Sequence, residues 1–231
     1  MKSFTLATIF FLFAFTCSFA QKTTRVTVQD NEDIQYALKD QLYRFPAFQN
    51  GKVFLPNGKY NSAKLNLNLL TNQIQFIDEK KDTLTILSPE QLHHVEIDGI
   101  TFIYHENGFL EMIGDYFPVA LARNQKLKIV DRQREGAYGT KSSSASIATV
   151  STGYTDQLRY NPKVHEDLLV NKVETFYLVD DKTNVSEVSK RNLQRAFPAH
   201  KNKISEYIKE NKIRFNKEQE VKALLEYIGK L

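Results

Sequence analysis

Apolar and polar residues alternate with a period of two between residues 53 and 130, a pattern typical of half-buried strands. The clearest stretch is Lys64 to Leu69, where leucines alternate with polar residues. Three dipeptides between such segments can adopt the positive φ angles of tight hairpin turns: Asn57-Gly58, Asp98-Gly99 and Asn107-Gly108. Because these turns lie too close together for crossover helices, we expect the sheet to be antiparallel.

Segments with helical periodicity precede and follow the β-rich region. The segment from Asp33 to Arg44 predicts a short helix that ends before Pro46. Near the C-terminus, Ser189 can cap one helix, and Asn216 with Gln219 reads as the capping box of the last one. Further residues carry the apolar stripes of these helices: Ile204, Tyr207, Ile208, Val221, Leu224, Leu225 and Ile228. The sequence thus predicts an α+β fold, in which an antiparallel β-meander or open barrel-like sheet is followed by a C-terminal cap of two or three helices.

These patterns divide the chain into three parts. Residues 1–20 read as a signal peptide, residues 21–185 as an antiparallel β-rich domain, and residues 186–231 as a basic helical segment that packs on the sheet. Within the β-rich part, residues 136–160 form a long loop rich in serine and threonine, with too few large aliphatic residues to bury much surface.

The signal peptide is the most distinctive feature of the sequence. Lys2 provides a positive start, an apolar run follows, and Ser18 and Ala20 offer small residues at the −3 and −1 positions of a cleavage site. The apolar run is shorter than the roughly 20 residues of a membrane-spanning helix. We therefore expect cleavage between Ala20 and Gln21, with no transmembrane segment in the mature chain. Cys17 could indicate a lipoprotein, but Phe15 and Thr16 before it fit that pattern poorly.

Composition limits the chemistry of the mature protein. Cys17 is the single cysteine of the 231-residue chain, so its removal with the leader would exclude disulfides, thiolate catalysis and cysteine-based metal sites. Residues 186–231 hold eleven Lys and Arg against six Asp and Glu. A basic segment can bind an acidic partner, but the interspersed glutamates favour a solvated helix face, and export argues against nucleic acid as the partner.

Several separated segments carry a resemblance to a known group of proteins. They are the stretch from Phe45 to Val53, the stretch from Ala63 to Leu70, Gln73 to Asp78, and Asp82-Thr83-Leu84. Together with Gly136-Ala137-Tyr138-Gly139 and the lysine-rich end, these segments resemble a group of exported, uncharacterised proteins of the Bacteroidota. The resemblance implies a location in the cell envelope and a shared fold. It implies no activity and no catalytic residue.

Asp82-Thr83-Leu84 is also similar to the tripeptide on which such bacteria O-glycosylate their exported proteins. Thr83 is therefore a candidate O-glycosylation site, although a β-branched residue in a strand explains it equally simply. A glycan would require Thr83 to lie on an exposed strand edge or turn.

The densest group of histidines and acids surrounds three candidate residues: His93, His94 and His105. Adjacent histidines in a strand point to opposite faces, so His93 and His94 are not expected to chelate one ion, and no metal or other cofactor is predicted. No Gly-x-Ser-x-Gly motif accompanies the serines at residues 142–151, so the sequence also lacks the signature of one large class of serine hydrolases.

These observations lead to a functional hypothesis with two alternatives. We expect an exported envelope protein that acts as a non-catalytic binding module, with an envelope or outer-membrane protein as a candidate partner. Its place could be the periplasm, the outer membrane or the extracellular space. A curled sheet could instead carry a small apolar ligand. The second alternative is an unrecognised hydrolase built on His93, His94 and His105, and the sequence favours the non-enzymatic hypothesis over it.

Overall fold

A computed structural model describes residues 23–29, 33–106, 108–135, 141–143 and 166–231 of the chain. The expected cleavage site at Ala20 and Gln21 lies outside these residues, as does most of the loop expected at 136–160. The part of that loop that is described, Lys141–Ser143, forms a short strand, β10, that pairs with β9.

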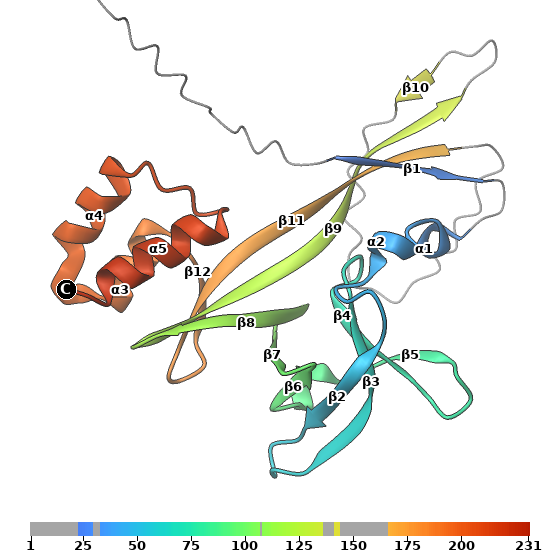
Figure 1. Cartoon of the computed structure of the whole chain (residues 1–231), viewed down its shortest axis with the longest axis horizontal. Coiled ribbons are helices and arrows are strands. Elements are labelled where there is room, and N and C mark those ends of the chain that lie inside the picture. The colour runs from blue at the N-terminus through green and yellow to red at the C-terminus, as the bar shows by residue number, and fades with distance from the viewer. Residues whose placement is uncertain (1–22, 30–32, 107, 136–140, 144–165) are drawn as a thin grey trace, which may run out of the picture.

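The described strands form one antiparallel sheet (Figure 1). Along its main path the order is β1-β11-β9-β8-β7-β6-β2-β3-β4-β5, while β10 pairs with β9 and β12 with β11. The strand bounds are β1 Thr24–Val28, β2 Gln49–Phe54, β3 Tyr60–Asn68, β4 Gln73–Ile77, β5 Thr83–Thr85, β6 His94–Ile97, β7 Ile100–His105, β8 Gly108–Tyr116, β9 Val119–Glu135, β11 Glu166–Asp180 and β12 Val185–Glu187. The expected α+β class and antiparallel sheet are confirmed, and the sheet is not closed.

Two pairings depart from a simple up-and-down meander. β2 pairs with β6 as well as with its hairpin partner β3. The N-terminal strand β1 pairs with β11 at the far edge of the sheet. The long strands β9 and β11 pair along most of their length and form a diagonal ribbon (Figure 1). This ribbon connects the N-terminal strands with the C-terminal helices.

The helix expected from Asp33 to Arg44 is split into two short helices. α1 spans Ile34–Ala37, with the Asp33 side chain accepting a hydrogen bond from the Gln35 amide, and α2 spans Lys39–Leu42. The chain after α2 covers β3, so that Asn66 and Asn68 are fully buried although the alternating pattern placed them on a solvated face. Asn66 accepts a hydrogen bond from the Phe45 N–H at 3.1 Å and donates one to the Phe45 carbonyl at 2.9 Å.

The three expected hairpin turns have different outcomes. Asp98 and Gly99 both have positive φ, at 52° and 77°, as a type I′ turn between β6 and β7 requires. At Asn57-Gly58 only the glycine has positive φ, so a longer turn connects β2 and β3. The turn between β7 and β8 begins one residue earlier than predicted, because His105 pairs with Gly108 and Glu106 takes the positive φ.

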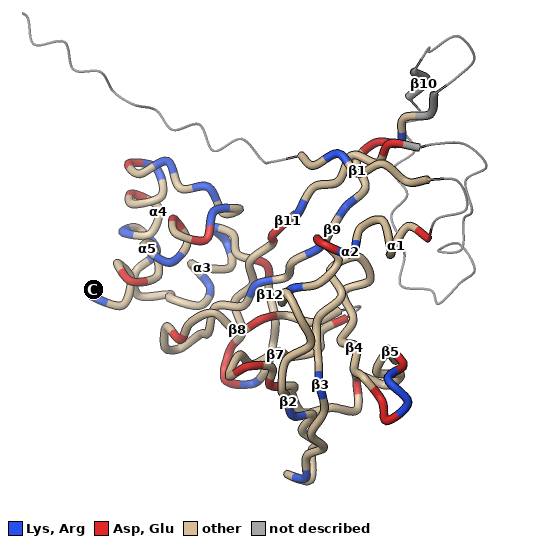
Figure 2. The backbone as a smooth tube through the Cα atoms, turned by 45° about the vertical axis from the view of Figure 1, so that its right-hand side comes forward, with Lys and Arg blue, Asp and Glu red and all other residues tan. Residues whose placement is uncertain are grey.

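Most of the helical structure lies at the C-terminus. α3 spans Lys190–Ala196, α4 Lys201–Glu210 and α5 Glu218–Ile228, while short 3₁₀ turns span Pro89–Gln91 and Pro198–His200. Ser189 caps α3 as predicted, accepting a hydrogen bond from the Asn192 amide at 3.2 Å. The predicted capping box is wrong, because Lys217 and not Asn216 occupies the N-cap position of α5, without a side-chain cap. Glu220, in the first turn, accepts a hydrogen bond from the Arg214 amide. Figure 2 shows basic and acidic residues interleaved along these helices.

Two large apolar clusters lie at opposite ends of the ribbon. The first joins α1, α2 and the N-terminal strands to Leu127 and Ile129 of β9 and to Leu168 and Val170 of β11. The second joins the C-terminal helices to four sheet residues: Val119, Leu121, Phe176 and Leu178. A smaller cluster gathers around Leu110, Ala122 and Val179. Among the described residues, no helix has the length and apolar character needed to cross a bilayer.

Candidate functional site

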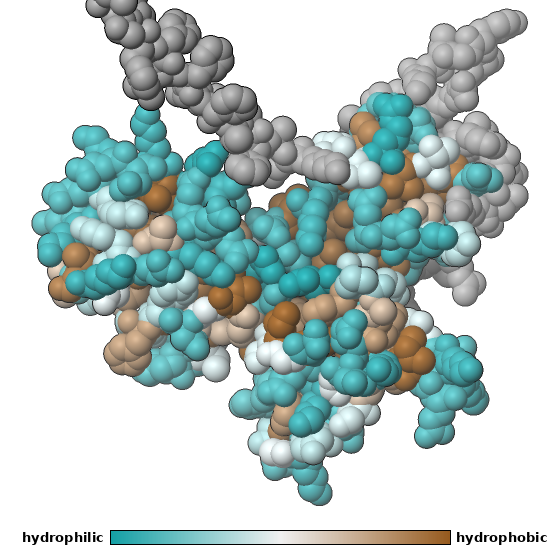
Figure 3. All heavy atoms as spheres, in the orientation of Figure 1, coloured by the Kyte–Doolittle hydropathy of each residue, from teal (hydrophilic) through white to brown (hydrophobic). Residues whose placement is uncertain are grey.

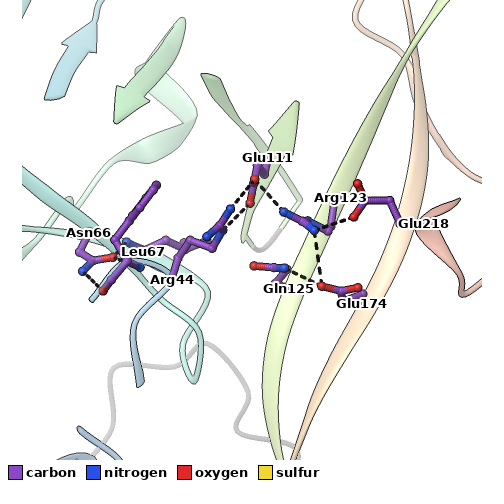
Figure 4. Close-up of polar contacts among 9 residues, drawn as sticks. Arg44, Asn66, Leu67, Glu111, Arg123, Gln125, Glu174 and Glu218 are labelled. Atoms are coloured by element: carbon purple, nitrogen blue, oxygen red, sulfur yellow. Dashed lines mark hydrogen bonds and ion pairs between the residues drawn. The ribbon is translucent and has the colours of Figure 1, made fainter. Parts of the chain in front are cut away.

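The most buried ionisable residue of the described chain, Glu111, lies between the two large clusters. Its side chain, on β8, accepts hydrogen bonds from Arg44 Nε at 2.9 Å and from Arg44 Nη2 at 3.0 Å. Arg123, its register partner on β9, donates to the same carboxylate at 2.8 Å (Figure 4). Both carboxylate oxygens therefore accept hydrogen bonds from guanidinium groups.

Two further glutamates extend this network. Arg123 Nη1 lies 2.8 Å from Glu218 of α5 and 3.6 Å from Glu174 of β11. Gln125 donates to Glu174 at 2.6 Å, and Lys222 lies 2.7 Å from Glu218. We call Arg44, Glu111, Arg123, Glu174 and Glu218 the charge belt, because it crosses from the N-terminal segment through the sheet to the C-terminal helices.

The charge belt is built to hold the fold rather than to transfer protons. Burial raises the pKa of Glu111, but hydrogen bonds from Arg44 and the positive charges of Arg123 and Arg44 outweigh burial and hold this pKa below its ordinary value. A carboxylate with a lowered pKa and both oxygens occupied is a poor general base. Burial lowers the pKa of the neighbouring Lys172.

A different surface offers polar groups to a ligand. The outer faces of β2, β3 and β6 enclose a shallow hollow of about 570 Å³. We call it the polar hollow; its lining consists of Asn50, Gly51, Lys52, Ser62, Ala63, Lys64, Glu96, Asp98 and Gly99. On the face drawn in Figure 3, the lobe that carries β2 and β3 is mostly hydrophilic.

Strand register explains how the polar hollow is assembled. Lys52 lies opposite Ser62 on β3 and opposite Glu96 on β6, which makes one cross-strand row. Asn50 lies opposite Lys64, and its carbonyl accepts a hydrogen bond from the Asp98 amide at 3.1 Å, which makes a second row. Because side chains alternate along a strand, these residues share the outer face.

Gly51 and Ala63 face the core between these rows. A Cβ atom at Gly51 would lie 2.5 Å from the Glu96 carbonyl oxygen and 2.6 Å from Leu65 Cδ1. Gly51 is therefore required by close packing beneath the polar hollow.

A row of rings borders the polar hollow on the same face. Tyr60 and Phe54 lie opposite each other, with their ring centroids 5.4 Å apart. Phe54 stacks on His94, with centroids 4.3 Å apart. We call Tyr60, Phe54 and His94 the aromatic row. The Lys52 ammonium lies 4.8 Å from the Tyr60 ring centroid, which connects the row to the polar hollow.

The three candidate histidines do not share one site. The expectation that His93 and His94 point to opposite faces is wrong, because β6 begins at His94 and His93 precedes it. Their Nδ1 atoms lie 2.6 Å apart, and His94 Nε2 lies 3.6 Å from Glu96. His105 pairs instead with Glu106, at 3.5 Å. Across the described ranges, no group of three or more His, Cys, Asp and Glu residues is placed to hold a metal ion.

Thr83 opens the short edge strand β5 and is exposed, as is Leu84 next to it. This place in the fold meets the steric condition stated above for a glycan, because both the strand edge and the side chain are accessible.

Sequence reasoning missed both the charge belt and the polar hollow. One signal for the belt was available: Glu111 occupies an inward position of the period-two pattern, between Phe109 and Ile113. For the polar hollow, the polar residues at 50, 52, 62 and 64 were visible, but the contribution of β6 depends on a pairing that the local pattern does not predict.

Comparison with protein-family models, curated proteins and solved structures finds no match to the chain.

Proposed function

We propose that this protein is an exported, non-catalytic binding module of the bacterial cell envelope, and that the polar hollow is its binding surface. The observation that carries the proposal is the contrast between the two polar regions. The charge belt satisfies its own charges in the interior, whereas the polar hollow presents exposed hydrogen-bonding groups from three strands on one face.

The side chains of the polar hollow are not committed to one another. Cross-strand Lys52 and Glu96 form no ion pair with each other, nor do Lys64 and Asp98, within the part of the chain that the structure describes. Lys64 and Asp98 therefore remain available to a ligand at the cost of displacing water, while Glu96 lies 3.6 Å from His94 Nε2 and Lys52 lies over the Tyr60 ring. Four charged side chains of the lining favour a ligand with hydrogen-bonding groups over the small apolar ligand of the carrier hypothesis, which could use only the apolar surface between them.

Export rests on the sequence. The leader pattern before Gln21 and the resemblance to exported proteins of the Bacteroidota both support it. Mass spectrometry of the protein from its native host tests this part, with an N-terminus at Gln21 as the expected result. A chain that retains residues 1–20 would contradict export by this route.

The binding proposal is tested with immobilised mature protein and an envelope extract. We expect wild type to retain an extract component that the double variant Lys64→Gln/Asp98→Asn loses. Asn is tolerated at positive φ, so Asp98→Asn preserves the turn. A matched control, Lys39→Gln/Asp40→Asn, changes the same residue types on the exposed surface of α2 and should retain the component. Equal retention by all three proteins, or none by wild type, would contradict the proposal.

A further inference from the structure

We infer that the ligand of the polar hollow is a carbohydrate, namely a short oligosaccharide. This inference rests on the proposed function and names its ligand class. It follows from three properties of the site: its charge balance, the pairing of its strands and the aromatic row beside it.

The charge balance disfavours a simple anion or cation. The lining presents two ammonium groups, Lys52 and Lys64, and two carboxylates, Glu96 and Asp98. An anion attracted by Lys52 and Lys64 would be repelled by the two carboxylates. A cation attracted by the carboxylates would be repelled by the two lysines. A hydroxyl both donates and accepts hydrogen bonds, so a polyhydroxylated ligand can pair with ammonium, carboxylate, Asn50 and Ser62 alike.

Strand pairing disfavours an extended peptide. Strand addition requires an open sheet edge, where backbone groups are free to pair. β2 pairs with β3 and β6, β3 also pairs with β4, and β6 also pairs with β7. At the polar hollow β2 and β6 are paired on both sides, whereas Tyr60–Ala63 of β3 pair with β2 alone. A ligand that lies over the face of these strands, rather than along the edge of β3, is recognised through side chains.

The aromatic row supplies the apolar contact that a sugar ring can use. One face of a pyranose ring presents C–H groups, which pack favourably against the electron-rich face of an aromatic ring. Tyr60 is 52% exposed at the border of the polar hollow. Exposed cation–π contacts are weak, so a sugar ring can displace the Lys52 ammonium from Tyr60 and leave it free to donate to a hydroxyl.

The volume suits this ligand class. At about 570 Å³, the polar hollow lies within the range of roughly 300–1,000 Å³ typical of small-molecule sites. Because it is shallow and open, a chain of sugars can extend past it in either direction.

The test measures binding of neutral and acidic oligosaccharides to the mature protein, first on an array and then by calorimetry with the best-bound one. We expect at least one oligosaccharide to bind. Tyr60→Ala, Lys64→Gln and Asp98→Asn should each weaken its affinity by about tenfold, the factor for losing one contact to a charged or aromatic group.

Tyr36→Ala is the matched control for Tyr60→Ala. Tyr36 is 61% exposed and also has a lysine, Lys39, over its ring, at 4.7 Å. The control should bind like wild type, and circular dichroism should show all four variants folded.

Binding that is unchanged in the three variants, or a blank array, would overturn the carbohydrate inference. The extract experiment separates this failure from failure of the proposed function. A non-carbohydrate component retained by wild type but lost from Lys64→Gln/Asp98→Asn would overturn the inference alone. No retained component, together with a blank array, would overturn both.

Discussion

Glu111 shows how one residue can look ordinary in the sequence and be structurally decisive. Its neighbours in the alternating pattern are apolar, and its only local signal is a charge at an inward position. The arginines that neutralise it lie 67 and 12 residues away along the chain. A local hydrophobic pattern shows that a charged residue occupies an inward position, but it does not show which arginines pair with it. The charge belt could therefore not be predicted from periodicity.

Replacing Glu111 by Gln should destabilise the protein strongly. The change keeps the shape but leaves the guanidinium groups of Arg44 and Arg123 facing a neutral amide, and breaking such a buried pair costs about 3–5 kcal/mol. Urea denaturation measures the loss. Glu90→Gln, on an exposed 3₁₀ turn, is the control and should change stability by no more than about 0.5 kcal/mol.

The same variant should alter the response to acid. The unfolded chain protonates Glu111 near the ordinary pKa of 4.5, whereas the folded carboxylate stays ionised to lower pH. Its stabilising effect is therefore complete above about pH 5 and is lost as the pH falls through the folded pKa. Wild type should lose stability more steeply below about pH 4.5 than Glu111→Gln. Parallel slopes would show that Glu111 is not held by the arginines.

Asn66 is a second residue whose role the alternating pattern hides. The Asn66 side-chain amide forms hydrogen bonds with both the N–H and the carbonyl of Phe45. These bonds hold the segment after α2 against β3. Asn66→Leu should cost about 2–4 kcal/mol, because two buried backbone groups lose their partners. Asn61→Leu, at an exposed position of the same strand, should be close to neutral in the same denaturation assay. Similar losses in both variants would contradict this role.

At the scale of elements, some local signals predicted the structure correctly, whereas the long-range pairings could not be predicted. Ser189 could be predicted as a cap because its bond partner lies three residues away. The capping box at Asn216 failed because α5 begins one residue later, with Lys217 at the N-cap position, and Glu220 bonds Arg214 across the loop before the helix. The turn at Asp98-Gly99 has the predicted geometry, but the pairing of β1 with β11 joins segments about 140 residues apart along the chain.

Gly51 tests the packing of β2 against its neighbours. Gly51→Ala should cost about 1–3 kcal/mol, because the added methyl group meets the Glu96 carbonyl and Leu65 in a closely packed sheet. Thermal unfolding followed by circular dichroism checks this loss. Gly58→Ala is a useful comparison, since nothing lies within 4 Å of its Cβ and its cost comes from the positive φ alone. Unchanged stability of Gly51→Ala would show that β2 and β3 are less closely packed than described.

At the scale of the molecule, one sheet serves two apolar clusters, and the charge belt lies between them. Arg123 on the ribbon connects Glu111 on the N-terminal side to Glu218 on α5. This arrangement makes the C-terminal helices depend on the sheet for their packing and for part of their ionic contacts.

Glu218→Gln should therefore loosen the helices before the rest of the fold. The variant loses charged contacts to Arg123 and Lys222, at a cost of about 1–3 kcal/mol. Hydrogen exchange should accelerate in α3–α5 more than in β2–β4. Glu226→Gln, on the exposed face of the same helix, should exchange like wild type. Uniform acceleration over the whole chain would contradict a special link at Glu218.

The central claim is that the polar hollow, and not the charge belt, meets the ligand. Amine-reactive labelling of the mature protein, with and without envelope extract, tests it most directly when read out by mass spectrometry. Protection from the reagent at Lys52 and Lys64, with unchanged labelling of exposed Lys39 and Lys80, is the predicted result. Equal labelling of all four lysines in both conditions, or protection confined to residues outside β2, β3 and β6, would contradict the account.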